Sequence, residues 1–131
     1  MTDDSKLGEH AHCIACWSPM EDCICKWAAP VDNRILVQIF MHHKEASRRS
    51  NSAHLLTLNL ERVKLEMHGA PNQPTRWPKA ADAGRLCVLF PYEGASVLTK
   101  NDSKRFDQLV VLDGNWRQAK KAANRIAKAC N

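Results

Sequence analysis

One stretch decides the fold of this chain: Val110-Val111-Leu112-Asp113-Gly114-Asn115-Trp116-Arg117-Gln118-Ala119-Lys120-Lys121. With Gln108 and Leu109 before it, it opens as an apolar, β-branched run that is typical of a buried strand. It then turns at residues 113–115, and from Trp116 onward the sequence takes the period of a helix. In open α/β sheets, ligands bind where strands end and helices begin. The turn is therefore either part of a binding site or a simple helix cap, formed by Asp113 or Asn115.

The helix after this turn is predicted to be amphipathic. Its apolar arc contains Trp116, Ala119, Ala123, Ile126 and Ala127. Its basic arc contains Arg117, Lys120, Lys121, Arg125 and Lys128. A carboxylate, an amide and an indole thus lie between the end of the strand and the N-terminus of a basic helix.

Length and composition limit the classes of protein to which this chain can belong. The chain has 131 residues, enough for one domain with one core, and its 44% hydrophobic and 25% charged residues are typical of a soluble globular protein. The formal net charge of +5 favours a polyanionic partner, although such an excess is a weak sign of nucleic acid. The sequence contains no apolar run of membrane-spanning length and starts with acidic and polar residues. We therefore expect no signal peptide, no membrane partner and a cytoplasmic location.

Four of the six cysteines crowd into a short segment near the start of the chain. They form a C-x-x-C pair, Cys13 and Cys16, and a C-x-C pair, Cys23 and Cys25. Two such pairs can supply four thiolates to one tetrahedral metal, and a reducing cytosol disfavours disulfides. We predict a structural zinc knuckle with these ligands; the alternative is a redox dithiol at Cys13 and Cys16, which leaves the second pair unexplained.

A second predicted strand, residues 33–40, runs into a polar loop at 41–52. The loop contains His42, His43, Arg48 and Arg49 and is able to hold phosphate or carboxylate at a strand end. The alternative is a solvated loop in which Ser50 or Asn51 caps a short helix that begins near Ala53.

Further strands are predicted at residues 61–67 and 85–90, a loop at 69–83, and one helical turn at 96–101. The order strand, helix, strand, strand, helix indicates an α/β fold with a mostly parallel sheet flanked by helices.

Together these segments resemble the DTW-domain family, the tRNA-uridine aminocarboxypropyltransferases, which are related to the knotted SPOUT methyltransferases. Four blocks match in the family's order: the cysteine block, the His42/Glu45 loop with 52–56, the strand end 89–91, and the signature 113–116 with Ala119-Lys120-Lys121 after it. The resemblance implies a SPOUT-like α/β fold.

The chain departs from the family pattern in three places. Asn115 stands where the family has Thr, and His43 stands where Pro is usual. The chain also stops at Asn131, where the family continues with segments that build the cofactor knot. We therefore expect a tail and zinc knuckle at 1–30, and a partial DTW domain, lacking its C-terminal part, at 31–131.

The resemblance implies a specific reaction. The 3-amino-3-carboxypropyl group of S-adenosylmethionine moves to a uridine nitrogen of tRNA, and methylthioadenosine is released. The uracil imide needs a general base, for which Asp113 is the candidate, with Trp116 to stack on a base and Asn115 to hydrogen-bond. The expected S-adenosylmethionine-binding residues are Phe90, Pro91 and Gly114. The expected RNA-binding residues are His42, Arg48, Arg49, Arg117, Lys121 and Arg125.

A rival hypothesis from another class is a non-catalytic RNA-binding module, made of the zinc knuckle and the basic helix. Methylthioadenosine production from S-adenosylmethionine and tRNA separates the two.

Overall fold

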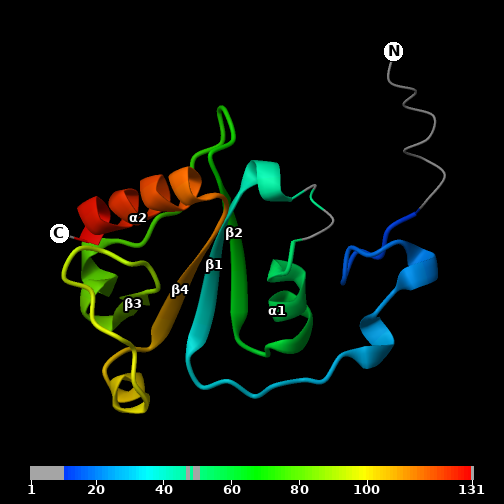
Figure 1. The fold of residues 1–131 in the computed structure, drawn as a ribbon, viewed down its shortest axis with the longest axis horizontal. Helices are drawn as coiled ribbons and strands as arrows, with labels where there is room; N and C mark the ends of the chain where they lie inside the picture. Colours follow the sequence, from blue (N-terminus) through cyan, green and yellow to red (C-terminus); the bar gives the residue numbers. More distant parts are fainter. Residues whose placement is uncertain (1–10, 47, 49–50, 131) are drawn as a thin grey trace.

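The computed structural model describes residues 11–46, 48 and 51–130. These residues form an α/β fold around a four-stranded sheet in the order β2-β1-β4-β3, in which every neighbouring pair is parallel (Figure 1). The strands are β1 (Leu36–His42), β2 (Val63–His68), β3 (Leu86–Val88) and β4 (Gln108–Asp113). The predicted fold class, a parallel sheet flanked by helices, is confirmed.

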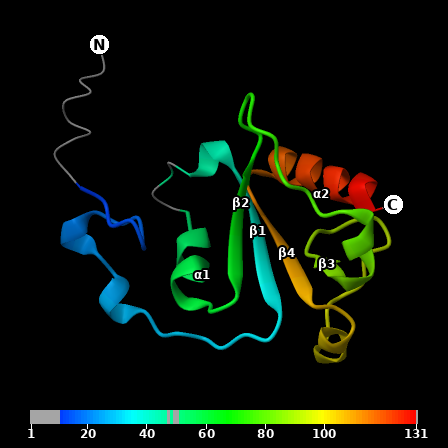
Figure 2. The same cartoon turned by 180° about the vertical axis from the view of Figure 1, so that it is seen from behind.

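One α-helix covers each face of the sheet, as Figures 1 and 2 show from opposite sides. Helix α1 (Ala53–Asn59) packs on a core that includes Ile39 and Met41, and helix α2 (Trp116–Cys130) packs on a core that includes Phe40 and Val110. Each core contains alternate residues of the same strands, because successive side chains of a strand point to opposite faces of the sheet.

Several element boundaries differ from the predicted ones. Strand β1 begins at Leu36 and continues through Met41 to His42, because Met41 is fully buried and pairs with strands on both sides. Strand β3 ends at Val88, two residues early, and the helical turn expected at 96–101 is a 3-10 helix at Lys100–Lys104.

Helix α2 buries a different set of residues from the predicted apolar arc. Ala122, Ala123 and Ile126 are in the core, whereas Trp116 is 65% exposed. Trp116 is the first residue of the helix, so it lies beyond the end of β4, where its ring stacks on Phe90 instead. The placement of Trp116 on the core face was therefore wrong.

The cysteine segment lies beside α1, away from the sheet (Figure 1). It contains two short 3-10 helices, Met20–Asp22 and Cys25–Trp27. The rings of Trp17 and His54 join it to α1, with centroids 3.6 Å apart. No helix in the described part of the chain is both long and apolar enough to span a membrane.

Candidate functional site

The carboxyl ends of β1, β2 and β4 meet at one edge of the sheet. There His42 pairs with His68, and Met41 pairs with both Met67 and Asp113. Strand alternation turns His42 and His68 toward the α2 side, and Asp113 toward the α1 side. The side chains at the strand ends therefore lie on opposite faces of the sheet.

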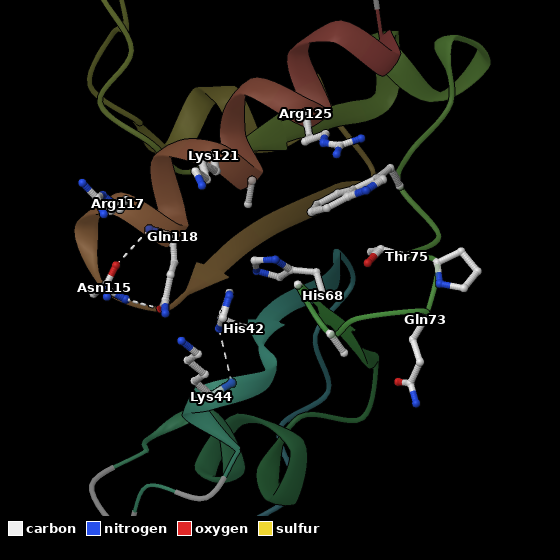
Figure 3. Close-up of a pocket in the computed structure, with 15 residues that line it drawn as sticks. His42, Lys44, His68, Gln73, Thr75, Asn115, Arg117, Gln118, Lys121 and Arg125 are labelled. Atoms are coloured by element: carbon white, nitrogen blue, oxygen red, sulfur yellow. Dashed lines mark hydrogen bonds between the residues drawn. The ribbon is translucent and has the colours of Figure 1, made fainter.

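A cleft of about 730 Å³ opens on the α2 side of this edge (Figure 3). Helix α2 forms one wall, the segment 69–75 forms the other, and His42, His68 and Trp77 lie between them. Four cationic side chains also line it: Lys44, Arg117, Lys121 and Arg125. None of the described residues that line the cleft is acidic. The cleft is therefore suited to an anionic ligand.

The three cations of α2 stand on one face of the helix. Arg117, Lys121 and Arg125 are spaced four residues apart, so they form a row of roughly 12 Å along the helix axis. All three are exposed, and no ion pair within the described ranges involves them. The row is thus free to neutralise phosphates.

The imidazoles of the cleft are packed into the sheet edge. Nδ1 of His42 accepts a hydrogen bond from the backbone N–H of Lys44 at 3.2 Å, and the ring meets that of His68 edge-on, with centroids 5.2 Å apart. His68 is only 6% exposed, and its burial, together with the charges of His42 and His43, lowers its pKa to about 4. Burial also lowers the pKa of His42. Both rings are therefore neutral near pH 7.

The buried His68 gives the fold an acid sensitivity that can be measured. Its pKa falls from an ordinary 6.5 to about 4 on folding, so between these values the unfolded chain binds the extra proton. The free energy of unfolding should therefore decrease as the pH falls from 6.5 to 4, by about 2–3 kcal/mol from this group. Denaturant titrations of the wild type and His68→Gln across this range measure the difference.

The cysteine thiols are the same in both proteins, so their own titration cancels in this comparison. His12→Gln, which removes an exposed histidine, is the control and should keep the wild-type slope. Identical slopes for the wild type and His68→Gln would contradict the assignment.

The signature turn is held by a reciprocal helix cap. Oδ1 of Asn115 accepts from the N–H of Gln118, and Oε1 of Gln118 accepts from the N–H of Asn115, each at 2.9 Å. A Cβ added at Gly114 would lie 2.8 Å from Oε1 of Gln118, so a larger residue there would disturb the cap. Asn115 thus caps α2, as one of the two interpretations of the turn predicted, and it also lines the cleft.

Asp113 does not line the cleft. Its Oδ2 accepts a hydrogen bond from Nδ2 of Asn51 at 2.8 Å, and Oδ1 of Asn51 accepts from the N–H of Ala53 at 2.8 Å. The N-cap residue of α1 is Ser52, not Ser50 or Asn51, and its side chain makes no cap bond. Asn51, one residue earlier, bonds the first N–H of the helix instead and links the start of α1 to the signature turn. Nearby His54 is 5% exposed, and neither ring nitrogen has a partner in the part of the chain that the structure describes.

A second groove, of about 860 Å³, lies along β3 and the segment after it. Phe90 and Pro91 line this groove, and the ring of Phe90 stacks on Trp116, with centroids 5.3 Å apart. The structure thus separates the expected cofactor residues: Phe90 and Pro91 lie here, and Gly114 lies at the end of β4 beside His42.

The four cysteines of the knuckle come together as the spacing predicted. All four sulfur atoms lie within 4.8 Å of one another, with Cys13 and Cys25 at 3.5 Å and Cys16 and Cys23 at 3.8 Å. Zinc bound to four thiolates at 2.3 Å separates the sulfurs by about 3.8 Å. A hydrogen bond from the backbone of Ile24 lowers the pKa of Cys16 to about 6, whereas hydrogen bonds with Cys13 and Cys23 raise the pKa of Cys25 to about 12. The metal assignment therefore rests on the distances between the sulfur atoms. The cluster can therefore hold a metal such as zinc.

Not every predicted RNA-binding residue reaches the cleft. His42, Arg117, Lys121 and Arg125 line it, whereas Arg48 pairs with buried Glu45 at 3.4 Å, and Arg49 lies outside the described residues. Sequence reasoning missed His68 and Gln118 as cleft residues. For His68 a signal existed, because it directly follows a predicted strand and so lies at a strand end.

The fold and site define an α/β domain with a four-cysteine cluster that can hold a metal and a cationic cleft whose described lining residues include no acidic one. The family model of the DTW domain matches residues 10–129, and the chain belongs to this family. Searches among curated proteins and among solved structures gave no match. The family is associated with tRNA-modifying transferases, which indicates an RNA-related role.

Proposed function

We propose that this protein is a tRNA-uridine aminocarboxypropyltransferase that uses S-adenosylmethionine. The observation that carries the proposal is the cationic cleft, free of acidic side chains among its described lining residues, between the start of α2 and the ends of β1 and β2. Such a cleft can bind the phosphates of RNA and bring a base to the signature turn. Membership of the DTW-domain family supports the same class of substrate.

The roles of this chain's own residues follow from their contacts. Asn51 holds Oδ2 of Asp113, and Oδ1 has no hydrogen-bond partner among the described residues, which leaves it to accept the uracil N3 proton. The nitrogen then forms a bond to the aminocarboxypropyl carbon as the carbon–sulfur bond breaks. The electron pair of that bond leaves with methylthioadenosine. Trp116, exposed at the start of α2, offers a ring on which a base can stack.

The groove that contains Phe90 and Pro91 fits a small cofactor in size. Its volume of about 860 Å³ is within the usual range for ligand sites. S-adenosylmethionine supplies an electrophilic carbon next to a sulfonium. The stacking of Phe90 on Trp116 brings this groove next to the first residue of α2. In the proposal we assign Phe90 and Pro91, which line this groove, to the cofactor, whereas Gly114 lies beside His42 and does not line it.

One observation favours the alternative of a non-catalytic RNA-binding module. Asp113 points to the α1 side and not into the cationic cleft. The deciding measurement is release of methylthioadenosine when the protein is mixed with S-adenosylmethionine and tRNA, together with mass analysis of the tRNA nucleosides. Release that requires tRNA supports the transferase. RNA binding without release supports the module.

The cationic row should control tRNA affinity. Lys121→Glu combined with Arg125→Glu should weaken binding of all tRNAs by at least tenfold, because each reversal replaces a phosphate partner with a like charge. The slope of log affinity against log salt should fall by roughly 0.7–0.9 for each phosphate that the variant no longer neutralises. Fluorescence anisotropy over a range of salt concentrations measures both.

The same helix provides a matched control. Lys120 and Lys128 are exposed but do not line the cleft, so Lys120→Glu combined with Lys128→Glu makes the same change in net charge elsewhere. Equal reductions of affinity in the two double variants would show that only net charge matters and that the cleft is not the binding site.

A further inference from the structure

The cationic cleft has two chemically different parts, and the division indicates what it binds. Its four cations are exposed and form what we call its rim (Figure 3). Its more buried part, which we call its floor, contains the neutral imidazoles of His42 and His68 and the indole of Trp77. Phosphates would bind at the rim, because the cations are there. The floor offers hydrogen bonding and aromatic surface without charge, which suits a nucleobase and not a phosphate.

His42 is held in one position at this floor. A Cβ added at Gly69 would lie 2.5 Å from Nε2 of His42, and one added at Gly114 would lie 3.5 Å from its Cβ. Only glycine permits this closeness at position 69, where φ is also +82°. The imidazole is therefore enclosed between the turns that follow β2 and β4, and its orientation does not depend on a ligand.

The backbone also fixes which nitrogen of His42 carries the proton. Nδ1 accepts the hydrogen bond from the N–H of Lys44, so in the neutral ring the proton is on Nε2. No residue in the described ranges accepts a hydrogen bond from that N–H. Burial, His43, Lys44 and Lys121 lower the pKa of His42 and Glu45 raises it, with a net lowering that keeps the ring neutral.

The floor also provides an aromatic surface. Trp77 lines the cleft, and one face of its indole stacks on buried Phe40, with centroids 5.1 Å apart. The ring of His68 lies against it at 5.3 Å. These side chains are packed into the core, so the aromatic surface is preformed.

We propose that the floor of the cleft is a nucleobase site in which Nε2–H of His42 donates a hydrogen bond to a carbonyl oxygen of an unpaired base. The cations of α2 hold the phosphates on either side. The proposal rests on the proposed function and adds to it the residue that selects the base: His42 would accept a keto base such as uracil from a single-stranded segment of RNA. A base in a duplex keeps its edges in the helix, and cannot reach a floor below a charged rim.

Binding measurements without S-adenosylmethionine test this proposal. The probes are a labelled oligouridylate of about ten nucleotides, its duplex with oligoadenylate, and the oligoadenylate alone. We expect the oligouridylate to bind more tightly than either other probe. His42→Phe keeps the ring but removes the donor, and should weaken oligouridylate binding about tenfold.

Two comparisons make the test specific. His12→Phe makes the same change at an exposed side chain that does not line the cleft, and should leave the affinity unchanged. His42→Phe should also leave the salt slope unchanged, because it removes a neutral donor, whereas Lys121→Gln should lower it. A lowered slope for His42→Phe, or equally tight binding of the duplex, would overturn the proposal.

The remaining outcomes are also informative. If His42→Phe does not fold, ¹⁵N NMR of the wild-type imidazole tests the site instead. The site is supported if the ring is the Nε2–H tautomer near pH 7 and if the Nε2 resonance shifts when oligouridylate is added. An unchanged Nε2 resonance at saturating RNA overturns it. Failure of the wild type to release methylthioadenosine would count against the proposed reaction alone, because none of these measurements involves transfer.

Discussion

Asp113→Asn is expected to lower the rate of aminocarboxypropyl transfer by roughly 10²–10⁴-fold, the usual contribution of a general base. The asparagine keeps an oxygen that can accept from Nδ2 of Asn51, so the link between the signature turn and α1 is retained. It cannot take the uracil proton at neutral pH. Methylthioadenosine release under saturating tRNA and S-adenosylmethionine measures the effect, and tRNA affinity should stay close to that of the wild type.

The opposite end of β4 provides the control. Asp107 precedes the strand and pairs with Arg85 at 3.0 Å, so Asp107→Asn makes the same chemical change far from the signature turn. It should leave transfer unaffected. Substantial transfer by Asp113→Asn would show that another group removes the proton.

The second large effect concerns the metal. Cys23→Ser combined with Cys25→Ser should reduce the zinc content from one ion per chain to none, because two thiolates cannot retain a site built for four. Binding of structural zinc contributes about 10–16 kcal/mol in small zinc-finger peptides, so the knuckle should also unfold. Metal analysis of the purified, reduced protein measures the zinc content.

The other two cysteines form the matched control. Cys87 and Cys130 lie outside the cluster, and burial raises the pKa of each, so Cys87→Ser combined with Cys130→Ser should keep the metal. Unfolding of the Cys23/Cys25 variant should also extend beyond the knuckle, since Trp17 stacks on His54 of α1, and α1 starts next to the Asn51 that holds Asp113. Retention of zinc by that variant would rule the site out.

Local patterns predicted the parts of this structure that depend on neighbours in sequence. The strand that ends at Asp113, the helix that begins at Trp116 and its cap at Asn115 all follow from periodicity and capping preferences within a few residues. The cysteine cluster also follows from spacing, because its ligands lie within thirteen positions.

The parts that sequence did not reveal depend on pairing between distant strands. The bond between Asn51 and Asp113 joins residues 62 positions apart. His68 enters the cleft because β2 lies beside β1, which only the strand order determines. The direction of Asp113 depends on the alternation of β4, and a shift of one residue in register would turn it into the cationic cleft.

The position of β1 between β2 and β4 has a consequence for the newly made chain. Val37 pairs with Val63, 26 positions further on, and with Leu109, 72 positions further on. During synthesis β2 can join β1 early, but the other edge of β1, an apolar strand, has no partner until β4 has left the ribosome. Pairing over such separations is slow, and an unpaired apolar edge invites aggregation. The strand order therefore leaves one apolar edge of β1 unpaired for as long as synthesis takes to proceed from β2 to β4.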